Sequence, residues 1–168
     1  MKLMTKANLE AAFAGESQAH MKYTIYAEKA EREGRPHVAR LFRAIAYAER
    51  VHATNHFRVL DGIHATVENL EAAAGGENYE VEEMYPAFAV VAELQNEKAA
   101  QRSIKYAIEA EKIHEVMYKE AKEQVEQGKD IADEKVWVCP VCGHTHIGPE
   151  APEECPVCKL KKDKYISF

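Results

Sequence analysis

Two Glu-x-x-His phrases hold the side chains best suited to metal binding in this chain. One pairs Glu49 with His52, and the other pairs Glu111 with His114. Side chains three positions apart on an α-helix lie on one face, so each pair can reach a single metal ion. A single such phrase arises by chance in charged helices, and one alone would be weak evidence of a metal site.

Three further glutamates stand on other segments with helical character. Glu16 lies near the middle of the first segment, and Glu80 and Glu83 lie three positions apart on the third. Two helices that bear Glu-x-x-His, alternating with two helices that bear glutamate, supply the ligand set of di-iron carboxylate proteins. We therefore expect these seven side chains to share one site with two metal ions.

The charge of this set indicates which metals suit it. Five carboxylates in a protein interior are too costly unless cations accompany them. Four glutamates would balance two divalent ions, and the fifth would suit a pair that cycles to the trivalent state. Oxygen and imidazole donors favour iron or manganese, and zinc, which has no redox chemistry, would leave such cycling without a purpose.

The four cysteines form two Cys-x-x-Cys pairs near the end of the chain. They are Cys139, Cys142, Cys155 and Cys158. Four thiolates in this spacing make a tetrahedral site for zinc or for one iron, and the spacing alone leaves both open. Attachment to a redox-active di-metal domain favours iron. His144 and His146 lie between the pairs and are expected at the surface, because four sulfurs already close the site.

Four segments with helical periodicity must position the carboxylates and histidines. They are expected at about 5–33, 37–60, 77–94 and 98–127. Thr5 is a plausible N-cap, Gly128 a C-terminal stop, and Pro86 a local distortion of the third segment. A connection of about 15 residues before the third segment indicates a bundle with one crossover.

The composition changes after the fourth segment. Residues 134–168 are rich in Cys, Pro, Gly and β-branched residues, and they are too few for a hydrophobic core of their own. We expect a mainly α protein with two domains: a ferritin-like four-helix bundle at 1–133 and a small tetracysteine domain at 134–168.

Composition and charge exclude other classes. The chain has 168 residues, 46% hydrophobic and 30% charged, and a net charge of −6. Acidic residues exceed basic ones by 23 to 17 within 1–133, which argues against nucleic acid as the main partner. No apolar run is long enough for a signal peptide or a membrane span, so we expect a cytoplasmic protein. In a reducing compartment two Cys-x-x-Cys pairs indicate metal or redox chemistry rather than structural disulfides.

Taken together, the motifs resemble the rubrerythrin family over nearly the whole chain. The matching phrases are Ala14-Gly15-Glu16-Ser17-Gln18, Ala48-Glu49-Arg50-Val51-His52, Glu80-Val81-Glu82-Glu83-Met84-Tyr85-Pro86, Ala110-Glu111-Lys112-Ile113-His114 and the rubredoxin-like cysteines. The third phrase is the most specific, because ordinary ferritins and bacterioferritins have a single glutamate there. Many relatives have a Glu-Glu-Gly turn after the third helix, where this chain has Glu93-Leu94-Gln95-Asn96-Glu97.

The resemblance implies a role for each ligand. Glu49 and Glu111 would bridge two irons, Glu16 would bind one iron, and Glu80 and His114 would bind the other. The four cysteines would bind a third iron.

The resemblance also implies three catalytic residues. Glu83 and His52 would exchange on the first iron, with Glu83 bound in the oxidised form and His52 in the reduced form. Tyr23 matches a tyrosine that lies beside the ligands in the family.

The activity that the resemblance implies is reduction of hydrogen peroxide to water in oxidative-stress defence. Electrons would come from an external donor, a rubredoxin or a reductase, through the tetrathiolate iron. The family forms homodimers or higher homo-oligomers in which the tetrathiolate of one subunit lies near the di-iron site of another. Some relatives exchange helices between subunits, and this stays open for the present chain.

Three alternatives stand beside this reading. A ferritin-like ferroxidase would form a large shell, which native mass detects, and would leave the cysteines without a role. A zinc ribbon on a helical scaffold would be colourless, whereas ferric tetrathiolate is red. His52 and His56 have the spacing of a zinc-hydrolase helix, but Ala53 stands where such enzymes carry their glutamate.

Overall fold

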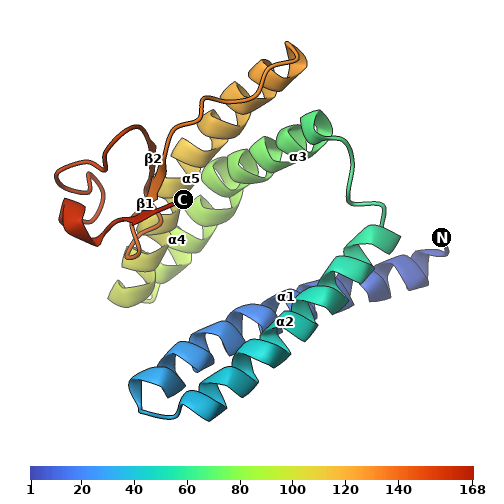
Figure 1. Cartoon of the computed structure of the whole chain (residues 1–168). Coiled ribbons are helices and arrows are strands. Elements are labelled where there is room, and N and C mark those ends of the chain that lie inside the picture. The colour runs from blue at the N-terminus through green and yellow to red at the C-terminus, as the bar shows by residue number, and fades with distance from the viewer. The chain divides into compact units, whose positions relative to one another are not determined.

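The computed structural model describes all 168 residues, which form two compact units, Met1–His64 and Ala65–Phe168. The first unit is a helical hairpin of α1 (Leu3–Arg32) and α2 (Pro36–Val59), packed along each other (Figure 1). Gly34 adopts a positive φ of 69° at the turn, a conformation that glycine adopts without steric cost. Pro36 then starts α2, where a missing N–H costs nothing.

A seam of alanines joins the two helices of the hairpin. The buried residues of this unit are Ala27, Ala30, Ala39, Ala46 and Ala53. Their small side chains let the two backbones approach closely, and the Phe13 and Phe57 rings stack near one end with centroids 4.9 Å apart. The N-cap prediction for Thr5 was wrong, because the helix begins at Leu3 and places Thr5 inside its first turns.

The second unit begins with a continuous helical segment packed along α5 (Lys98–Glu126). This segment consists of α3 (Thr66–Tyr79), a π-helical turn η1 (Glu80–Met84) and α4 (Tyr85–Leu94). Counted as one segment, it gives the chain four long helical stretches, as predicted. The expected start near Glu77 was wrong, and so was the long connection, because only residues 60–65 separate α2 from α3.

The start of α3 was predicted too late because of two glycines. Gly75 and Gly76 lie inside α3, where each costs about 1 kcal/mol relative to alanine. No neighbouring side chain or backbone would touch a Cβ at either position, so close packing does not require glycine there. Packing of α3 on α5 holds the helix together through this pair, and tertiary contact overrides local propensity.

The π turn and the turns between helices follow local chemistry. Pro86 sits in the first turn of α4, directly after the π turn, and this is the predicted distortion. Asn96 has a φ of 56° between α4 and α5, a region that asparagine tolerates better than most residues. Gly128 ends α5 with a φ of 73°.

The cysteine domain is a small antiparallel sheet with two cysteine-bearing loops. Its strands are β1 (Val136–Val138), β2 (Thr145–Ile147) and β3 (Ile166–Ser167), in the order β2-β1-β3. A 3-10 turn, η2 (Lys162–Lys164), precedes β3. The prediction of a mainly α chain followed by a cysteine-bearing domain is confirmed, while the boundary at 133/134 stays a prediction.

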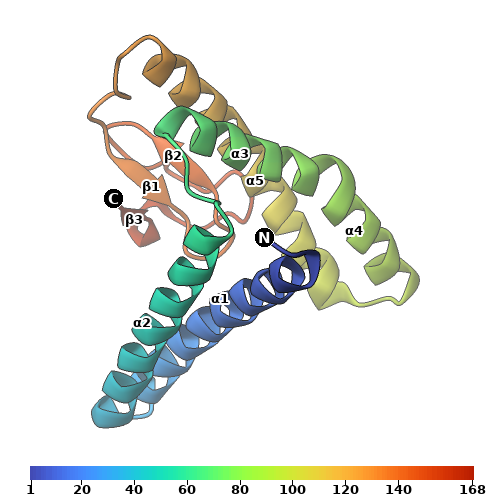
Figure 2. The same ribbon diagram turned by 90° about the vertical axis from the view of Figure 1, so that its right-hand side faces the viewer.

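This domain packs against α5 of its own unit (Figure 2). Tyr106 contacts the cluster of buried cysteines, and a Cβ at Gly143 would lie 3.6 Å from the Cβ of Ala110. No helix is both long and apolar enough to cross a membrane.

Candidate metal centres

The first group of possible ligands lies on the α1–α2 hairpin. Glu16 comes from α1, and Glu49 and His52 come from α2, with one ligand atom of each within 4.8 Å of the others. The His52 Nδ1 atom lies 3.1 Å from Glu49 Oε2 and 4.0 Å from Glu16 Oε1. We call this group the α1–α2 half-site.

The hairpin itself brings these side chains together. Glu49 lies between Ala46 and Ala53, three positions after one and four before the other, so its side chain starts from the buried face of α2. His20 of α1 hydrogen-bonds the Ala46 carbonyl oxygen through Nδ1 at 2.8 Å and ties the two helices at this level. The predicted proximity of Glu16 to the first Glu-x-x-His pair is therefore present within this unit.

Tyr23, the third predicted catalytic residue, lies about two helical turns from Glu16. Its ring packs against those of Phe42 and Tyr26, with centroids 6.2 Å and 6.3 Å away. The structure shows an aromatic cluster here rather than a hydrogen bond from the phenol to a carboxylate. Its catalytic role stays a prediction.

The second group lies between α3 and α5. Glu77, Glu111 and His114 place one ligand atom each within 4.8 Å of one another, and we call this group the α3–α5 half-site. His114 Nδ1 lies 2.6 Å from Glu111 Oε2. At that separation a proton or a cation must stand between the two atoms, because both otherwise present lone pairs.

Glu77 is a member of this group that the sequence analysis missed. Burial and a hydrogen bond to Glu111 raise the pKa of Glu77 to about 7. Near neutral pH a large share of Glu77 is therefore protonated and donates to the Glu111 carboxylate. Glu77 stood at the expected start of the third segment, and its spacing of three from Glu80 was the signal that could have identified it.

Glu80, the first residue of the π turn, and Tyr85, the first residue of α4, lie in the same electrostatic environment. Burial and the negative charge of Glu111 raise the pKa of Glu80. Burial also raises the pKa of Tyr85, together with the charges of these carboxylates. Glu83, in contrast, is exposed on the π turn and outside the group, so its exchange role stays a prediction.

His114 is also held on its far side. Its Nε2 atom lies 2.8 Å from Thr145 Oγ1 on β2, and the Thr145 hydroxyl donates to the Gly143 carbonyl oxygen at 3.0 Å. Both ring nitrogens of His114 thus have a partner within this unit. Metal-binding histidines are commonly fixed by such a contact at the nitrogen that does not bind the metal.

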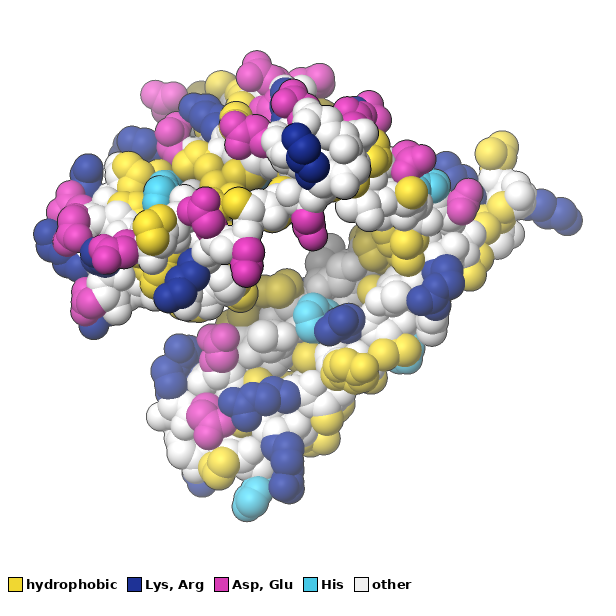
Figure 3. Space-filling model, turned by 45° about the horizontal axis from the view of Figure 1, so that its top comes forward, with side chains coloured by type: hydrophobic (Ala, Val, Ile, Leu, Met, Phe, Trp, Pro, Cys, Tyr) yellow, Lys and Arg dark blue, Asp and Glu magenta, His cyan; other side chains and the backbone are white.

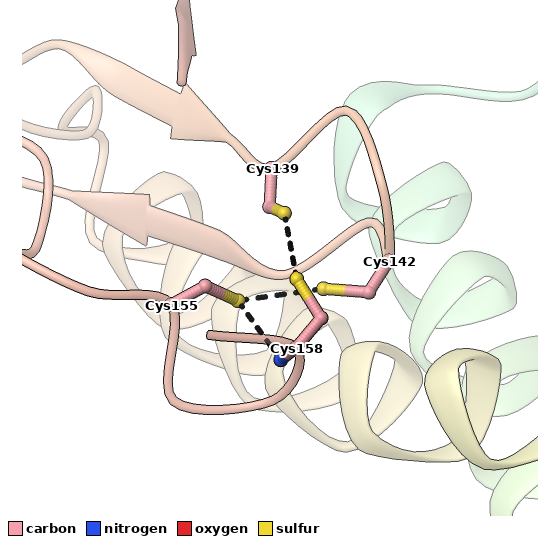
Figure 4. A group of neighbouring side chains, drawn as sticks. All are labelled: Cys139, Cys142, Cys155 and Cys158. Carbon is pink, nitrogen blue, oxygen red and sulfur yellow. Dashed lines mark hydrogen bonds between the residues drawn. The ribbon is translucent and has the colours of Figure 1, made fainter. Parts of the chain in front are cut away.

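The four cysteines converge at the end of the small sheet (Figure 4). The sulfurs of Cys139 and Cys158 are 3.4 Å apart, and those of Cys142 and Cys155 are 3.5 Å apart. A tetrahedral ion with metal–sulfur bonds of about 2.3 Å needs sulfurs about 3.8 Å apart, whereas a disulfide needs about 2.05 Å. The geometry fits one tetrahedral metal ion rather than two disulfides.

The surroundings favour thiolate at one of these cysteines in particular. Burial raises the pKa of Cys142 and of Cys158. Burial acts the same way on Cys155, but hydrogen bonds from the Tyr165 hydroxyl and from nearby backbone N–H groups outweigh it and lower its pKa to about 6. Hydrogen bonds to a metal-bound sulfur stabilise its negative charge in the same way.

His144 corrects another prediction. It was expected at the surface, but only 5% of it is exposed, and its Nδ1 atom lies 2.9 Å from the Tyr165 hydroxyl. Burial lowers its pKa and keeps the ring neutral. The loop after Cys142 turns His144 toward Tyr165, a tertiary contact that the spacing of the cysteines does not predict.

Carboxylates and imidazoles on long helices, joined to a tetrathiolate domain, define a class of protein: a helical di-metal carboxylate protein with a rubredoxin-like domain. Comparison with known families agrees. The rubrerythrin family model matches residues 7–122, and the model of the rubrerythrin rubredoxin-like domain matches residues 137–166. The chain belongs to the rubrerythrin family.

Relatives and solved structures resemble the chain over nearly its whole length. Rubrerythrin-2 of Clostridium acetobutylicum is 43% identical, with 98% of this chain and 97% of that protein covered. Nigerythrin of Nitratidesulfovibrio vulgaris is 34% identical, covering 98% and 86%. A structure of fully reduced, all-ferrous nigerythrin covers the same shares with a TM-score of 0.59.

Family membership and the donor sets together confirm the predicted cofactors. The chain is a di-iron protein whose carboxylates and histidines bind two irons, and whose tetracysteine knuckle binds one more. The donors present fit both groups: oxygen and imidazole for the iron pair, and four sulfurs for the single iron.

Proposed function

We propose that this protein is a peroxidase that reduces hydrogen peroxide to water as a defence against oxidative stress. The observation that carries the proposal is the combination of two Glu-x-x-His half-sites with a tetrathiolate domain packed against one of them. A two-electron reduction needs a pair of one-electron metals, and a tetrathiolate iron suits their re-reduction one electron at a time. The related nigerythrin has been solved in fully reduced, partially reduced and mixed-valence states, which supports redox cycling in this family.

The complete iron site would need both half-sites. Each half-site groups three donors, too few to surround two metal ions, whereas the Glu-x-x-His pairs together with Glu16, Glu80 and Glu83 match the di-iron ligand set. The seven proposed ligands are Glu16, Glu49, His52, Glu80, Glu83, Glu111 and His114. Glu49 and Glu111 would bridge, since each is the glutamate of its Glu-x-x-His pair.

Residues of the chain would supply the protons. Reduction of one peroxide consumes two electrons and two protons and gives two waters, and the bound irons supply the electrons. Glu77 lies within the α3–α5 half-site, where burial and a hydrogen bond to Glu111 raise its pKa to about 7 in the metal-free chain. The Tyr85 hydroxyl also keeps its proton, because its pKa is raised by burial and by the same carboxylates. Both are candidate proton donors.

The proposed mechanism is tested most directly through the exchange of Glu83 and His52 as ligands of one iron. Glu83→Ala should still bind iron, because the other six ligands remain, but should lose peroxide turnover. Glu82→Ala is the matched control, since Glu82 is the neighbouring exposed glutamate on the same π turn. Steady-state peroxide reduction and iron content would be measured for both. Wild-type turnover in Glu83→Ala would reject the exchange.

The assembly is also a proposal. We expect a homodimer or a small homo-oligomer served by a rubredoxin or a reductase. Native mass spectrometry distinguishes this from the 24-subunit shell of an iron-storage ferritin. A shell would favour ferroxidase chemistry over the proposed peroxidase.

A further inference from the structure

The Tyr165 hydroxyl lies between a buried histidine and one sulfur of the tetrathiolate. Tyr165 follows the 3-10 turn η2 and packs in one buried cluster with three of the four cysteines. Its oxygen lies 2.9 Å from Nδ1 of His144, a residue that is 5% exposed. Its hydroxyl also hydrogen-bonds Cys155. One side-chain oxygen therefore joins an imidazole to a metal-binding sulfur in a site closed to water.

Backbone hydrogen bonds hold both rings in place. The His144 carbonyl oxygen accepts from the Cys139 N–H at 2.9 Å. Tyr165 stands directly before β3, and Ile166 of β3 pairs with Val138 of β1. Val138 leads directly into Cys139, so both rings are tied to the start of the first cysteine loop. They meet edge to face, with centroids 6.0 Å apart and an angle of 87° between the planes.

Cys155 is the sulfur toward which these donors converge. None of its surface is exposed, and the Cys158 N–H lies 3.5 Å from its Sγ atom. The Val157 N–H donates to it as well. For Cys142 and Cys158, the donors from outside the four cysteines are backbone groups. The Tyr165 hydroxyl therefore gives Cys155 a side-chain donor that a substitution can remove without changing the loop.

The single hydrogen of the Tyr165 hydroxyl has two acceptors within reach, the Cys155 sulfur and the His144 Nδ1 atom. In the iron-bound chain the sulfur is a negatively charged thiolate, and hydrogen bonds to charged acceptors are about twice as strong as those between neutral groups. A neutral imidazole can carry its hydrogen on either nitrogen, so His144 can donate to the phenol oxygen without a change of charge. The sulfur is therefore the favoured acceptor of the hydroxyl hydrogen.

We propose that the Tyr165 hydroxyl, held by His144, raises the reduction potential of the tetrathiolate iron by donating a hydrogen bond to Cys155. Reduction adds one electron to the ferric ion and makes it ferrous, and no bond forms or breaks. The iron and its four sulfurs then carry one more negative charge, which a hydrogen-bond donor stabilises. Tyr165 and His144 are thus positioning residues that act through a sulfur ligand. The inference does not depend on the substrate of the di-iron site.

The first experiment measures the reduction potential of the tetrathiolate iron in the full chain by spectroelectrochemistry, through the red absorbance of its ferric form. Tyr165→Phe keeps the ring and removes the hydroxyl. The equilibrium constant for reduction should fall about tenfold, which lowers the potential by about 59 mV for one electron. Tyr106→Phe is the matched control, because Tyr106 packs against the same cluster, and its potential should equal that of the wild type. An unchanged potential in Tyr165→Phe would overturn the proposal.

His144→Leu separates the two directions that the hydroxyl hydrogen can take. If Tyr165 donates to the sulfur, the loss of His144 removes only its support, so the potential should fall by less than in Tyr165→Phe. The double variant should then match Tyr165→Phe, because His144 acts through the hydroxyl. A potential that rises in His144→Leu would show that the hydrogen is bonded to the imidazole in the wild type. Either that rise or additive losses in the double variant would overturn the proposal.

A second readout uses the wild-type chain and no redox change. With cadmium-113 bound by the four cysteines, a hydrogen that is bonded to a ligand sulfur couples to the metal, and proton–cadmium NMR detects the coupling. The Tyr165 hydroxyl hydrogen should show it together with amide hydrogens of the cysteine loops. Amide couplings without a hydroxyl coupling would overturn the hydrogen bond to Cys155. A chain without peroxidase activity would reject the proposed function, while both measurements would still test Tyr165.

Discussion

The two half-sites use the same Glu-x-x-His phrase in different surroundings. In the α3–α5 half-site, 26% of the His114 side chain is exposed, and both its ring nitrogens have partners, Glu111 and Thr145. In the α1–α2 half-site, 54% of the His52 side chain is exposed, and its contacts are made by Nδ1 alone. The sequence spacing does not distinguish His52 from His114. In the structure His114 is held at both ring nitrogens, whereas His52 is held at Nδ1 only.

This difference fits the proposed ligand exchange. A histidine that leaves its iron on oxidation must rotate without breaking other bonds, and His52 is held at one side only. His114 is fixed beside the tetrathiolate, where a constant distance favours electron transfer. The two half-sites thus differ at the Nε2 atom of the histidine, which contacts Thr145 in His114 and has no such contact in His52.

The charge of the two units differs as well. The first 64 residues contain seven acidic and ten basic residues, whereas the rest of the chain contains 21 acidic and 12 basic. Figure 3 shows acidic side chains spread among lysines and arginines over the face in view. Raised carboxyl pKa values occur at Glu77 and Glu80, both in the more acidic unit. The α3–α5 half-site therefore has the greater need of cations.

The largest expected effect comes from removing each histidine in turn. His114→Ala should lose about one of the three irons per chain in the oxidised protein, because a fixed ligand is gone. His52→Ala should keep its iron when oxidised and lose it mainly after reduction. Iron would be counted before and after anaerobic reduction and desalting.

His56→Ala on α2 is the control for this pair, since His56 lies in neither half-site. Equal losses from His114→Ala and His52→Ala in both oxidation states would remove the distinction between a fixed and a free ligand.

A smaller effect should appear in the pH dependence of the metal-free protein. The pKa of Glu77 is about 7 in the folded state and 4.5 as a free side chain. Between these values Glu77 binds more protons in the folded than in the unfolded state, so its contribution to stability falls as pH rises from about 4.5 to 7. Glu77→Gln should remove this contribution in thermal melts of the chelator-treated protein. A pH dependence of the melting temperature that is identical in Glu77→Gln and the wild type would contradict the assignment.

The smallest effect concerns the hairpin that holds the freer histidine. A Cβ at Gly62 would overlap the Phe57 ring, which stacks on Phe13. Gly62→Ala should therefore cost about 1–2 kcal/mol of stability in urea unfolding. Because the change lies in the first unit, the visible spectrum of the tetrathiolate should stay as in the wild type. Unaltered stability together with a changed spectrum would show that the clash of a Cβ at Gly62 with Phe57 does not destabilise the hairpin.

The sequence was sufficient for features that depend on short spacing. The Glu-x-x-His pairs, the cysteine knuckles, α2 and α5 all follow from residues a few positions apart, and each was predicted. The start of α3 was not, because Gly75 and Gly76 look like a break and only packing on α5 overrides them. Glu77 was overlooked because it stood at the expected end of the helix rather than within it.

Other features depend on residues that are distant in sequence. His114 and Thr145 are 31 positions apart, and His144 and Tyr165 are 21 apart. Neither pair has a local pattern, since each arises where the small sheet folds back on itself or on α5. The two Glu-x-x-His pairs and the four cysteines, which the structure groups together, were visible from sequence spacing, whereas the contacts that orient their side chains were not.

The π turn at Glu80–Met84 sets the angle between the two helical parts that flank it. A π turn accommodates one residue more than the α-helical ladder around it, and an α-helix rotates by about 100° per residue. Deleting one residue here would restore the regular ladder but rotate Glu77 by about a quarter-turn relative to α4. The side chains before and after the turn could then no longer both face α5.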